Sequence, residues 1–295
     1  MPPEANPGEN TPNAPEFHNK PPEAHRVLIS RPTGARMMRS VLMNAATTTT
    51  SPVLAVLGDS VGVGVGDPAL GGGWRGFAPL LAEALGGARL TNLAVSGSRI
   101  GGVLETQLPA ALALRPDVAV VLVGMNDTMR SDFDEEWLHA DLGHVVGTLV
   151  AAGTTVITAK YHDHHRVFRL PGPLRRALAS RIAALNDVVD TVAREHRVGL
   201  VDLGQVPGIY APEAWAVDRL HPSELGHRLL ARALAAQLAA LGTAVHQEVS
   251  LQCAGGRTPG RVARWAWLLF KGLPWLVRRG KDLVPYALST FIRRG

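Results

Sequence analysis

From Pro52 onward, short β-branched runs alternate with longer stretches rich in alanine and leucine, and this alternation constrains the fold more than any other feature. The runs have the length of strands, and in the stretches between them apolar residues recur at intervals of three and four, as on one face of a helix. Strands and helices that alternate in this way form a parallel sheet covered by helices. The sequence therefore predicts an α/β fold, a three-layer α/β/α sandwich around a central parallel sheet of about five strands.

Five runs are suited to strands of this sheet. They cover residues 53–57, 89–94, 118–123, 154–159 and 198–203. The first and the third are apolar throughout, as strands covered by helices on both faces must be. Helices are expected over residues 76–85, 135–152, 174–196 and 223–241.

The composition divides the 295 residues into three regions. Residues 1–50 are rich in Pro, Glu, Asn and Thr and follow neither a strand nor a helix period, so we expect a disordered N-terminal arm. Residues 51–243 form the α/β domain, and a hydrophobic content of 46% is ample for its core. Residues 244–295 form a basic, tryptophan-rich tail that we expect to be helical.

The net charge of +5 is unevenly distributed along the chain. Residues 257–294 contain nine Lys or Arg and one acid, an excess of +8, which leaves −3 for the rest. The sequence pI of about 9.9 therefore arises in the tail, and no nucleic-acid partner is expected. Aromatic residues interleaved with the basic ones, such as Trp265, Trp267 and Trp275, suit a bilayer interface. We expect peripheral membrane contact through residues 257–295, and the alternative is that this segment packs on the domain as a lid.

Three features bear on the cellular compartment. Cys253 is the only cysteine, so no intramolecular disulfide forms, which fits a reducing environment. No run of about eighteen apolar residues predicts a spanning helix, and the N-terminal residues lack the pattern of a signal peptide. We expect a cytoplasmic protein, with the tail as its contact to the membrane.

The triplet Gly58-Asp59-Ser60 lies where the first apolar run gives way to a glycine-rich stretch. A serine there is placed on the first turn after a buried strand, beside the backbone N–H groups of a starting helix. Serine needs a base within hydrogen-bonding distance, and the base needs a group that orients its ring. Asp218 and His221, three residues apart in a loop ahead of the last helix, suit these roles of orienter and base.

A serine nucleophile also needs hydrogen-bond donors for the oxyanion of its tetrahedral intermediate. Two loops that follow expected strands offer such donors. Gly97 can present a backbone N–H without a side chain in the way, and Asn126 can present a side-chain amide. Ser60 would add its own N–H.

These residues resemble the SGNH hydrolases, also called the GDSL esterase/lipase family. The four blocks of the family occur in order: Gly58-Asp59-Ser60, Gly97, GxND at residues 124–127, and DxxHP at residues 218–222. The resemblance covers residues 52–242 and implies a flavodoxin-like fold of the SGNH hydrolase type. It also implies Ser60 as nucleophile, His221 as base, Asp218 as the partner of His221, and an oxyanion hole formed by Ser60, Gly97 and Asn126. Val61 stands where many members have leucine.

Each block has an ordinary structural interpretation when taken alone. Ser60 could cap a helix in a nucleotide-binding domain, but the glycines that follow match neither a dinucleotide fingerprint nor a P-loop. Asp218 and His221 could be a loop ion pair, Asn126 and Asp127 an Asx-turn, and Gly97 a turn glycine. The four blocks together favour the catalytic interpretation, in which Asp59 and Asp127 serve only loop hydrogen bonds.

The segment Tyr161-His162-Asp163-His164-His165 follows the fourth expected strand. Adjacent histidines point in divergent directions in an extended loop, and the chain contains no second ligand cluster, so a metal site is the less favoured interpretation. We expect this segment to line the substrate entrance or to be solvated.

The sequence thus predicts a serine esterase that hydrolyses a carboxylic ester, with a small acyl or lipid ester as substrate, through an acyl-Ser60 intermediate. The scheme needs neither a metal nor an organic cofactor. Two alternatives stay open: an acyltransferase that uses the same triad, and a membrane-associated binding module without catalytic activity.

Overall fold

A computed structural model describes residues 51–168 and 172–254. Within these residues five parallel strands form one sheet in the order β2-β1-β3-β4-β5. The strands are β1 (Val53–Gly58), β2 (Arg89–Asn92), β3 (Val118–Leu122), β4 (Thr155–Lys160) and β5 (Gly199–Asp202). From β1 the chain continues to β2 on one side and then crosses to β3 on the other side of β1. The carboxyl ends of β1 and β3 therefore form the topological switch point of a doubly wound sheet.

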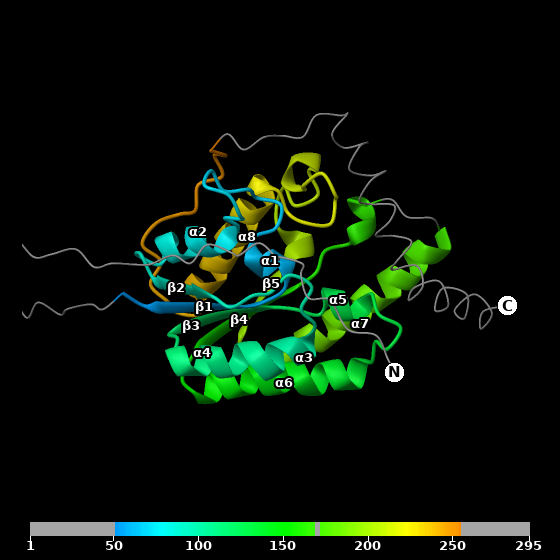
Figure 1. Cartoon of the computed structure of the whole chain (residues 1–295), viewed down its shortest axis with the longest axis horizontal. Coiled ribbons are helices and arrows are strands. Elements are labelled where there is room, and N and C mark those ends of the chain that lie inside the picture. Colours follow the sequence, from blue (N-terminus) through cyan, green and yellow to red (C-terminus); the bar gives the residue numbers. More distant parts are fainter. Residues whose placement is uncertain (1–50, 169–171, 255–295) are drawn as a thin grey trace, which may run out of the picture. The chain divides into compact units, whose positions relative to one another are not determined.

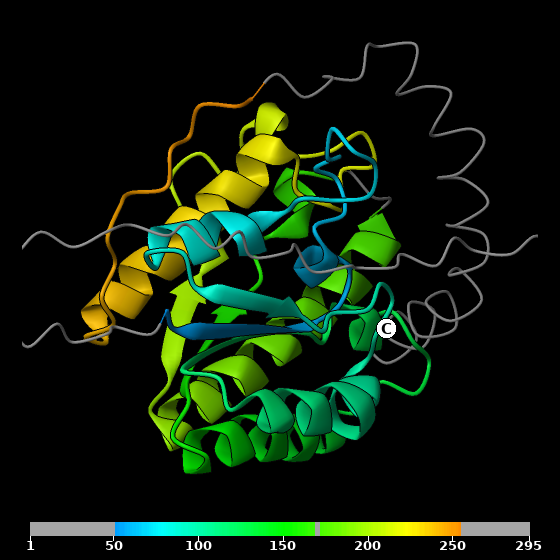
Figure 2. The same cartoon turned by 60° about the vertical axis from the view of Figure 1, so that its left-hand side comes forward.

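Helices cover both faces of the sheet, as Figures 1 and 2 show. One face carries α2 (Phe77–Ala84) and α8 (Glu224–Ala240), which lie above the sheet in Figure 1. The other face carries α3 (Ile100–Gly102), a π-helical turn (Val103–Gln107), α4 (Leu108–Leu114), α6 (Glu135–Ala151) and α7 (Gly172–His196). The three-layer α/β/α sandwich predicted from the sequence is confirmed.

Shorter helical turns follow the carboxyl ends of the strands. The α-helical turns are α1 (Ser60–Val63) after β1 and α5 (Met125–Thr128) after β3. The 3₁₀ turns cover His164–Arg166, Leu203–Gln205 and Pro212–Ala214. Because all five strands run in the same direction, these turns gather at one edge of the sheet.

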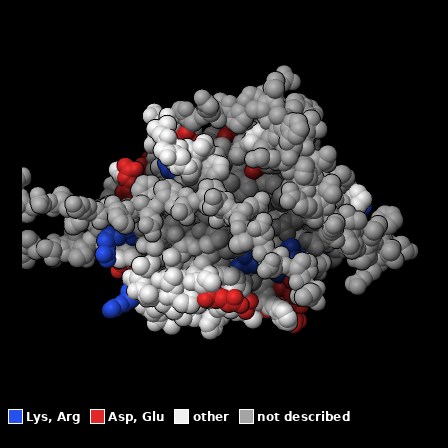
Figure 3. Space-filling model, viewed as in Figure 1, with Lys and Arg blue, Asp and Glu red and all other residues white. Residues whose placement is uncertain are grey.

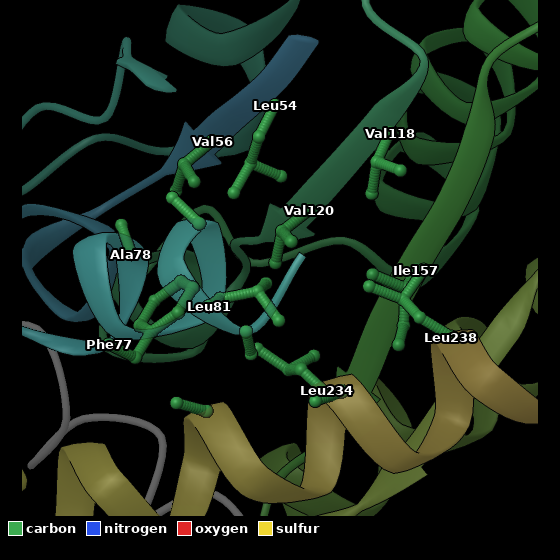
Figure 4. Packing of buried hydrophobic residues seen from close by; sticks show 14 of the residues in the cluster. Leu54, Val56, Phe77, Ala78, Leu81, Val118, Val120, Ile157, Leu234 and Leu238 are labelled. Carbon is green, nitrogen blue, oxygen red and sulfur yellow. The ribbon is translucent and has the colours of Figure 1, made fainter. Parts of the chain in front are cut away.

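The apolar character of β1 and β3 follows from this layering. Leu54 and Val56 of β1 pack toward α2 and α8, as Figure 4 shows, whereas Ala55 and Leu57 belong to the cluster on the opposite face. Neighbouring side chains of a strand point to opposite faces, so a strand with helices on both sides has no position for a polar residue. Opposite β1, the first face is filled from α2 and α8 by Phe77, Ala78, Leu81, Leu234 and Leu238.

Charged side chains lie mostly outside these clusters. Figure 3 shows Lys and Arg, and Asp and Glu, in small separate groups over the described part of one face, with uncharged residues between them. Some of the charges are paired locally, for example Arg194 with Asp190 one helical turn before it. Because neighbouring charges of opposite sign largely cancel, the electric field of this part of the surface reaches only a short distance.

The expected elements differ most from the observed ones in two places. The largest omission is the helical stretch from Ile100 to Leu114, where Gly101, Gly102 and Pro109 weaken the sequence pattern of a helix. The tail was expected to begin at residue 244 and to be helical, but residues 244–254 have no helix and lie on the domain. Arg232 donates hydrogen bonds to the carbonyl of Val249, and Val249 is buried.

Two predicted regions, the arm of residues 1–50 and the basic aromatic segment of residues 257–295, lie outside the described residues. Membrane contact through that segment therefore stays a prediction. No helix within residues 51–168 or 172–254 is both long and apolar enough to span a bilayer.

Gly58 ends β1 in a conformation that only glycine adopts without strain. Its φ is +143°, and a Cβ at this position would overlap the carbonyl oxygen of Leu122 on β3. A side chain would not fit here because β1 and β3 lie close together. The Asp59 amide donates a hydrogen bond to the same Leu122 carbonyl at 3.3 Å. Gly58 thus fixes where the chain leaves the sheet.

We predict that Gly58→Ala lowers the free energy of unfolding by more than about 2 kcal/mol, because strain and overlap add. Gly87→Ala is the matched control, since Gly87 also has a positive φ of 79° but a Cβ there would meet nothing within 4 Å. The control should lose only about 1 kcal/mol. Urea denaturation measures both, and equal losses in the two variants would contradict the argument from overlap.

Candidate active site

The residues singled out in the sequence meet at the carboxyl edge of the sheet. Ser60 is the first residue of α1, directly after β1, and Asp59 caps this short helix by accepting a hydrogen bond from the Val61 amide at 3.0 Å. The sharp change from strand to helix at Gly58 turns the Ser60 side chain away from the core. Ser60 is partly exposed, whereas Asp59 beside it is buried.

Ser60, His221 and Asp218 form a hydrogen-bonded relay. The Ser60 hydroxyl lies 2.9 Å from His221 Nε2, and His221 Nδ1 lies 2.7 Å from an oxygen of Asp218. Burial disfavours the charged form of Asp218, but hydrogen bonds from the His221 ring and from the Leu220 and His221 amides keep the pKa of this carboxyl below its ordinary value. An ionised Asp218 fixes the tautomer of His221 with Nδ1–H, which leaves Nε2 free to accept the serine proton.

The loop that holds His221 is itself closed by backbone hydrogen bonds. The Ala216 amide donates to the His221 carbonyl at 2.9 Å, and the Ser223 amide donates to the Ala214 carbonyl at 2.9 Å. Arg219 adopts a left-handed conformation with φ of 58° at the tip of this loop. Ser223 then caps α8, as its sequence position predicted. These hydrogen bonds hold the turn that carries His221 in one conformation.

Three groups suited to bind an oxyanion surround Ser60. Within the described residues, the backbone amides of Ser60 and Gly97 have no hydrogen-bond acceptor. Gly97 has a φ of +85°, and a Cβ there would meet nothing within 4 Å, so its backbone conformation rather than crowding calls for glycine. The Asn126 amide donates to the Ser98 carbonyl at 3.1 Å and to Asp59 at 3.3 Å.

Asp59 is a buried carboxyl next to the candidate nucleophile. Burial raises its pKa to about 6, and the nearby Asp127 adds to this, while the Val61 amide and His221 oppose it. Asp127 is held separately by Arg99 at 3.1 Å and by the Ile100 amide. Asp59 and Asp127 thus serve the loop hydrogen bonds expected from the sequence, and Asp59 in addition touches Asn126.

Gln107 is a functional position that the sequence did not reveal. Its side chain accepts a hydrogen bond from the Gly58 amide at 2.7 Å and donates one to the Gly58 carbonyl at 3.0 Å. It also lies 3.1 Å from the Ser98 hydroxyl, next to Gly97. The π-helical turn before α4 brings Gln107 inward. No sequence pattern predicts this turn, and none predicts the contact of Gln107 with Gly58, which lies 49 residues earlier in the chain.

A cavity of about 250 Å³ opens at the relay. Besides the relay and oxyanion residues, its wall is mostly apolar. The apolar part comes from Leu122, Met125, Met129, Ala159, Phe168, Leu174, Leu178, Leu203, Ile209, Trp215, Leu220 and Leu230. A concave, largely apolar pocket with a few convergent polar groups is the usual form of a site for a small ligand.

The histidine segment after β4 also reaches this cavity. His162 and His164 are buried and line it, as the favoured interpretation expected, and their rings stack with centroids 4.2 Å apart. Burial lowers the pKa of His164 to about 4 and holds that of His162 further below its ordinary value. Among residues 51–168 and 172–254, no group of three or more His, Cys, Asp or Glu side chains is placed to hold a metal ion.

Comparison with known proteins identifies the family of this chain. Residues 56–229 match the model of the GDSL-like lipase/acylhydrolase family. The chain belongs to this family. Its members are hydrolases of carboxylic esters, so the enzyme class predicted from the sequence is confirmed.

Individual relatives of this GDSL-like hydrolase are distant. An acetylxylan esterase from Geobacillus stearothermophilus is 27% identical over 184 residues, which are 56% of this chain and 80% of the relative. A crystal structure of an acetylxylan esterase from that organism has a TM-score of 0.52 at 22% identity and covers 63% of this chain and 94% of its own. An α/β hydrolase from the metagenome of Lake Arreo has a TM-score of 0.52 at 23% identity over 65% and 95% of the two chains. These structures support the fold.

We predict that the free energy of unfolding depends on pH through the titration of Asp59. An unfolded aspartate loses its proton near pH 3.8, whereas folded Asp59 keeps it to about pH 6, so the free energy of unfolding falls as the pH rises through this interval and is level above it. Asp59→Asn lacks this titration. The stability of the wild type relative to Asp59→Asn should fall by about 3 kcal/mol between pH 4 and pH 7 in urea denaturation. A difference that is independent of pH would contradict the raised pKa.

Proposed function

We propose that this GDSL-like hydrolase is a serine esterase that acts through an acyl-Ser60 intermediate, with His221 as general base and Asp218 as its orienting partner. The observation that supports this most is the relay of 2.9 Å and 2.7 Å from Ser60 through His221 to Asp218 at the wall of the cavity. A nucleophile, a base and an orienting carboxylate within hydrogen-bonding distance are the arrangement that serine acyl transfer needs.

In this scheme the Ser60 hydroxyl oxygen attacks the carbonyl carbon of the ester while its proton passes to His221 Nε2. The tetrahedral intermediate collapses as His221 returns that proton to the leaving alcohol, and the acyl group stays on Ser60. A water molecule then gives a proton to His221 and attacks the acyl carbonyl. The acid leaves when His221 returns the proton to Ser60.

The oxyanion of this reaction would be bound by the amides of Ser60 and Gly97 and by the side chain of Asn126. Both hydrogens of the Asn126 amide already have acceptors, the Ser98 carbonyl and Asp59. The contact with Asp59 is the longer one, at 3.3 Å, and we propose that the oxyanion replaces it. The bond to Ser98 would then hold the amide in place during turnover, which is the preorganisation that makes such donors effective.

The cavity supports a substrate with a small acyl or alcohol group. An apolar cavity of about 150 Å³ holds one benzene molecule, so a volume of about 250 Å³ accepts roughly ten heavy atoms. The acetylxylan esterase from Geobacillus stearothermophilus is named for a short-chain ester, which favours the small acyl group within the proposed range.

We predict that Ser60→Ala lowers kcat for p-nitrophenyl acetate by at least about 10⁵-fold and abolishes labelling by a fluorophosphonate probe, because both need the serine oxygen. Ser250→Ala is the control, since Ser250 is an exposed serine that does not line the cavity. It should retain turnover and labelling. Labelling of Ser60→Ala at the wild-type rate would show that Ser60 is not the nucleophile.

We predict that kcat/KM is highest for p-nitrophenyl esters with acyl chains of about two to six carbons, because the volume of the cavity limits the chain that it can enclose. The palmitate ester should be hydrolysed with a kcat/KM at least ~10-fold lower, since most of that chain would remain in water. The series is measured below the micelle concentration of each ester. A kcat/KM that keeps rising up to palmitate would overturn the proposed small substrate.

A further inference from the structure

The side chain of His162 has hydrogen-bonding capacity that the protein does not use. It is only 3% exposed, and within the described part of the chain neither of its ring nitrogens has a hydrogen-bond partner. Burial keeps the ring neutral, with its pKa far below the ordinary value, so one nitrogen is a donor and the other an acceptor. Either nitrogen of such a neutral imidazole can pair with a hydroxyl, which donates to the acceptor nitrogen or accepts from the donor nitrogen.

The surroundings of His162 fix the ring without hydrogen bonds to it. The centroid of the Trp215 ring lies 4.3 Å from that of His162, and the stacked His164 ring lies 4.2 Å away. Tyr210 packs against the ring edge on, with centroids 6.1 Å apart. A ring held by three aromatic neighbours keeps its nitrogens in set positions, which lowers the entropy lost when a ligand binds.

His162 lies between two cavities. It lines the active-site cavity together with Ser60 and His221, and it lines a second cavity of about 290 Å³. Tyr161, His164 and Leu178 are shared by both cavities. Polar residues make up a larger share of the residues that line the second cavity. Its remaining wall comes from Asp163, His165, Arg175, Ala179, Ile182, Ala183 and Asn186.

Packing alone does not account for a histidine at this position. A buried polar group without a partner costs about 1–3 kcal/mol, and phenylalanine would fill much the same space among these aromatic rings without that cost. A buried side chain with two unpaired polar atoms at a cavity wall is a feature of binding sites, where the partner arrives with the ligand.

We propose that His162 is a specificity-determining residue that binds a neutral hydroxyl group of the substrate, so that hydroxyl-bearing esters are preferred over their apolar counterparts. This proposal rests on the esterase function proposed above. A hydroxyl can donate to the acceptor nitrogen or accept from the donor nitrogen, so it can pair with whichever nitrogen faces it, and a neutral ring offers no charge to attract a carboxylate. The hydroxyl lies on the acyl or on the alcohol side of the ester, and the experiment separates these two sources.

The test uses two pairs of esters of equal size. p-Nitrophenyl 3-hydroxypropanoate and p-nitrophenyl butanoate differ by a hydroxyl on the acyl side, and ethylene glycol monoacetate and propyl acetate differ by a hydroxyl on the alcohol side. We expect the wild type to show a kcat/KM at least ~10-fold higher for the hydroxylated member of one pair, since a buried polar site discriminates against a ligand that leaves it unpaired. Hydrolysis of both pairs without a preference in either would overturn the proposal and leave the esterase function standing. Absence of any hydrolysis would instead count against the esterase function itself.

Variants of His162 then assign the preference to this side chain. His162→Phe keeps a flat ring beside Trp215 and should reduce the preference to about 1. His162→Gln keeps a donor and an acceptor and should retain part of the preference. His227→Phe is the matched control, because His227 is also buried with an unpaired Nδ1 but lines neither cavity, and its ratio should be that of the wild type.

The outcome does not depend on the folding of one variant. The preference of the wild type is measured without any substitution, and melting temperatures show whether each variant is folded. If His162→Phe lowers kcat/KM for both members of a pair equally, the ring is needed for shape alone and the proposal fails. Loss of the preference in His162→Phe together with its partial retention in His162→Gln supports recognition by hydrogen bonds.

Discussion

The close approach of β1 to β3 at Gly58 is the constraint on which the site depends. The carbonyl of Leu122 leaves no room for a side chain there, and the Asp59 amide donates a hydrogen bond to this same carbonyl. Gln107 holds the amide and the carbonyl of Gly58 from the other side. Because these contacts fix the last residue of the strand, the start of α1 is fixed as well, and Ser60 meets a histidine 161 residues later in the chain at 2.9 Å.

The parts of this arrangement that the sequence predicted are those governed by local or periodic patterns. β1 and β3 are predictable because helices on both faces exclude polar residues from them. Ser60 was predictable because it follows β1 closely, and Asp218 and His221 because they stand three residues apart ahead of the last helix. The helical stretch from Ile100 to Leu114 was missed because Gly101, Gly102 and Pro109 are poor helix formers, and packing overrides this preference. The contact between Gln107 and Gly58 and the packing of His162 on Trp215 join distant segments, so no local pattern predicts them.

Burial has different consequences for the carboxyls of the site because their hydrogen bonds differ. Asp218 accepts hydrogen bonds from two backbone amides and the His221 ring, which together outweigh burial and keep it ionised. Asp59 accepts one backbone hydrogen bond and a long contact from Asn126, so burial dominates and its pKa rises to about 6. The carboxyl beside His221 is thus the one that hydrogen bonds hold in the ionised form, and the carboxyl beside Asn126 is the one that more readily becomes neutral. A neutral Asp59 would repel a developing oxyanion less than an ionised one.

The same reasoning separates the histidines around the cavity by function. His221 lies 2.7 Å from an ionised carboxylate, which would stabilise the imidazolium formed in the proposed transfer of the Ser60 proton. Burial holds His162 and His164 in the neutral form, so neither competes with His221 for this proton even though all three line one cavity. In the proposed mechanism the proton is thereby exchanged between Ser60 and His221, and the neutral ring of His162 remains available for hydrogen bonds.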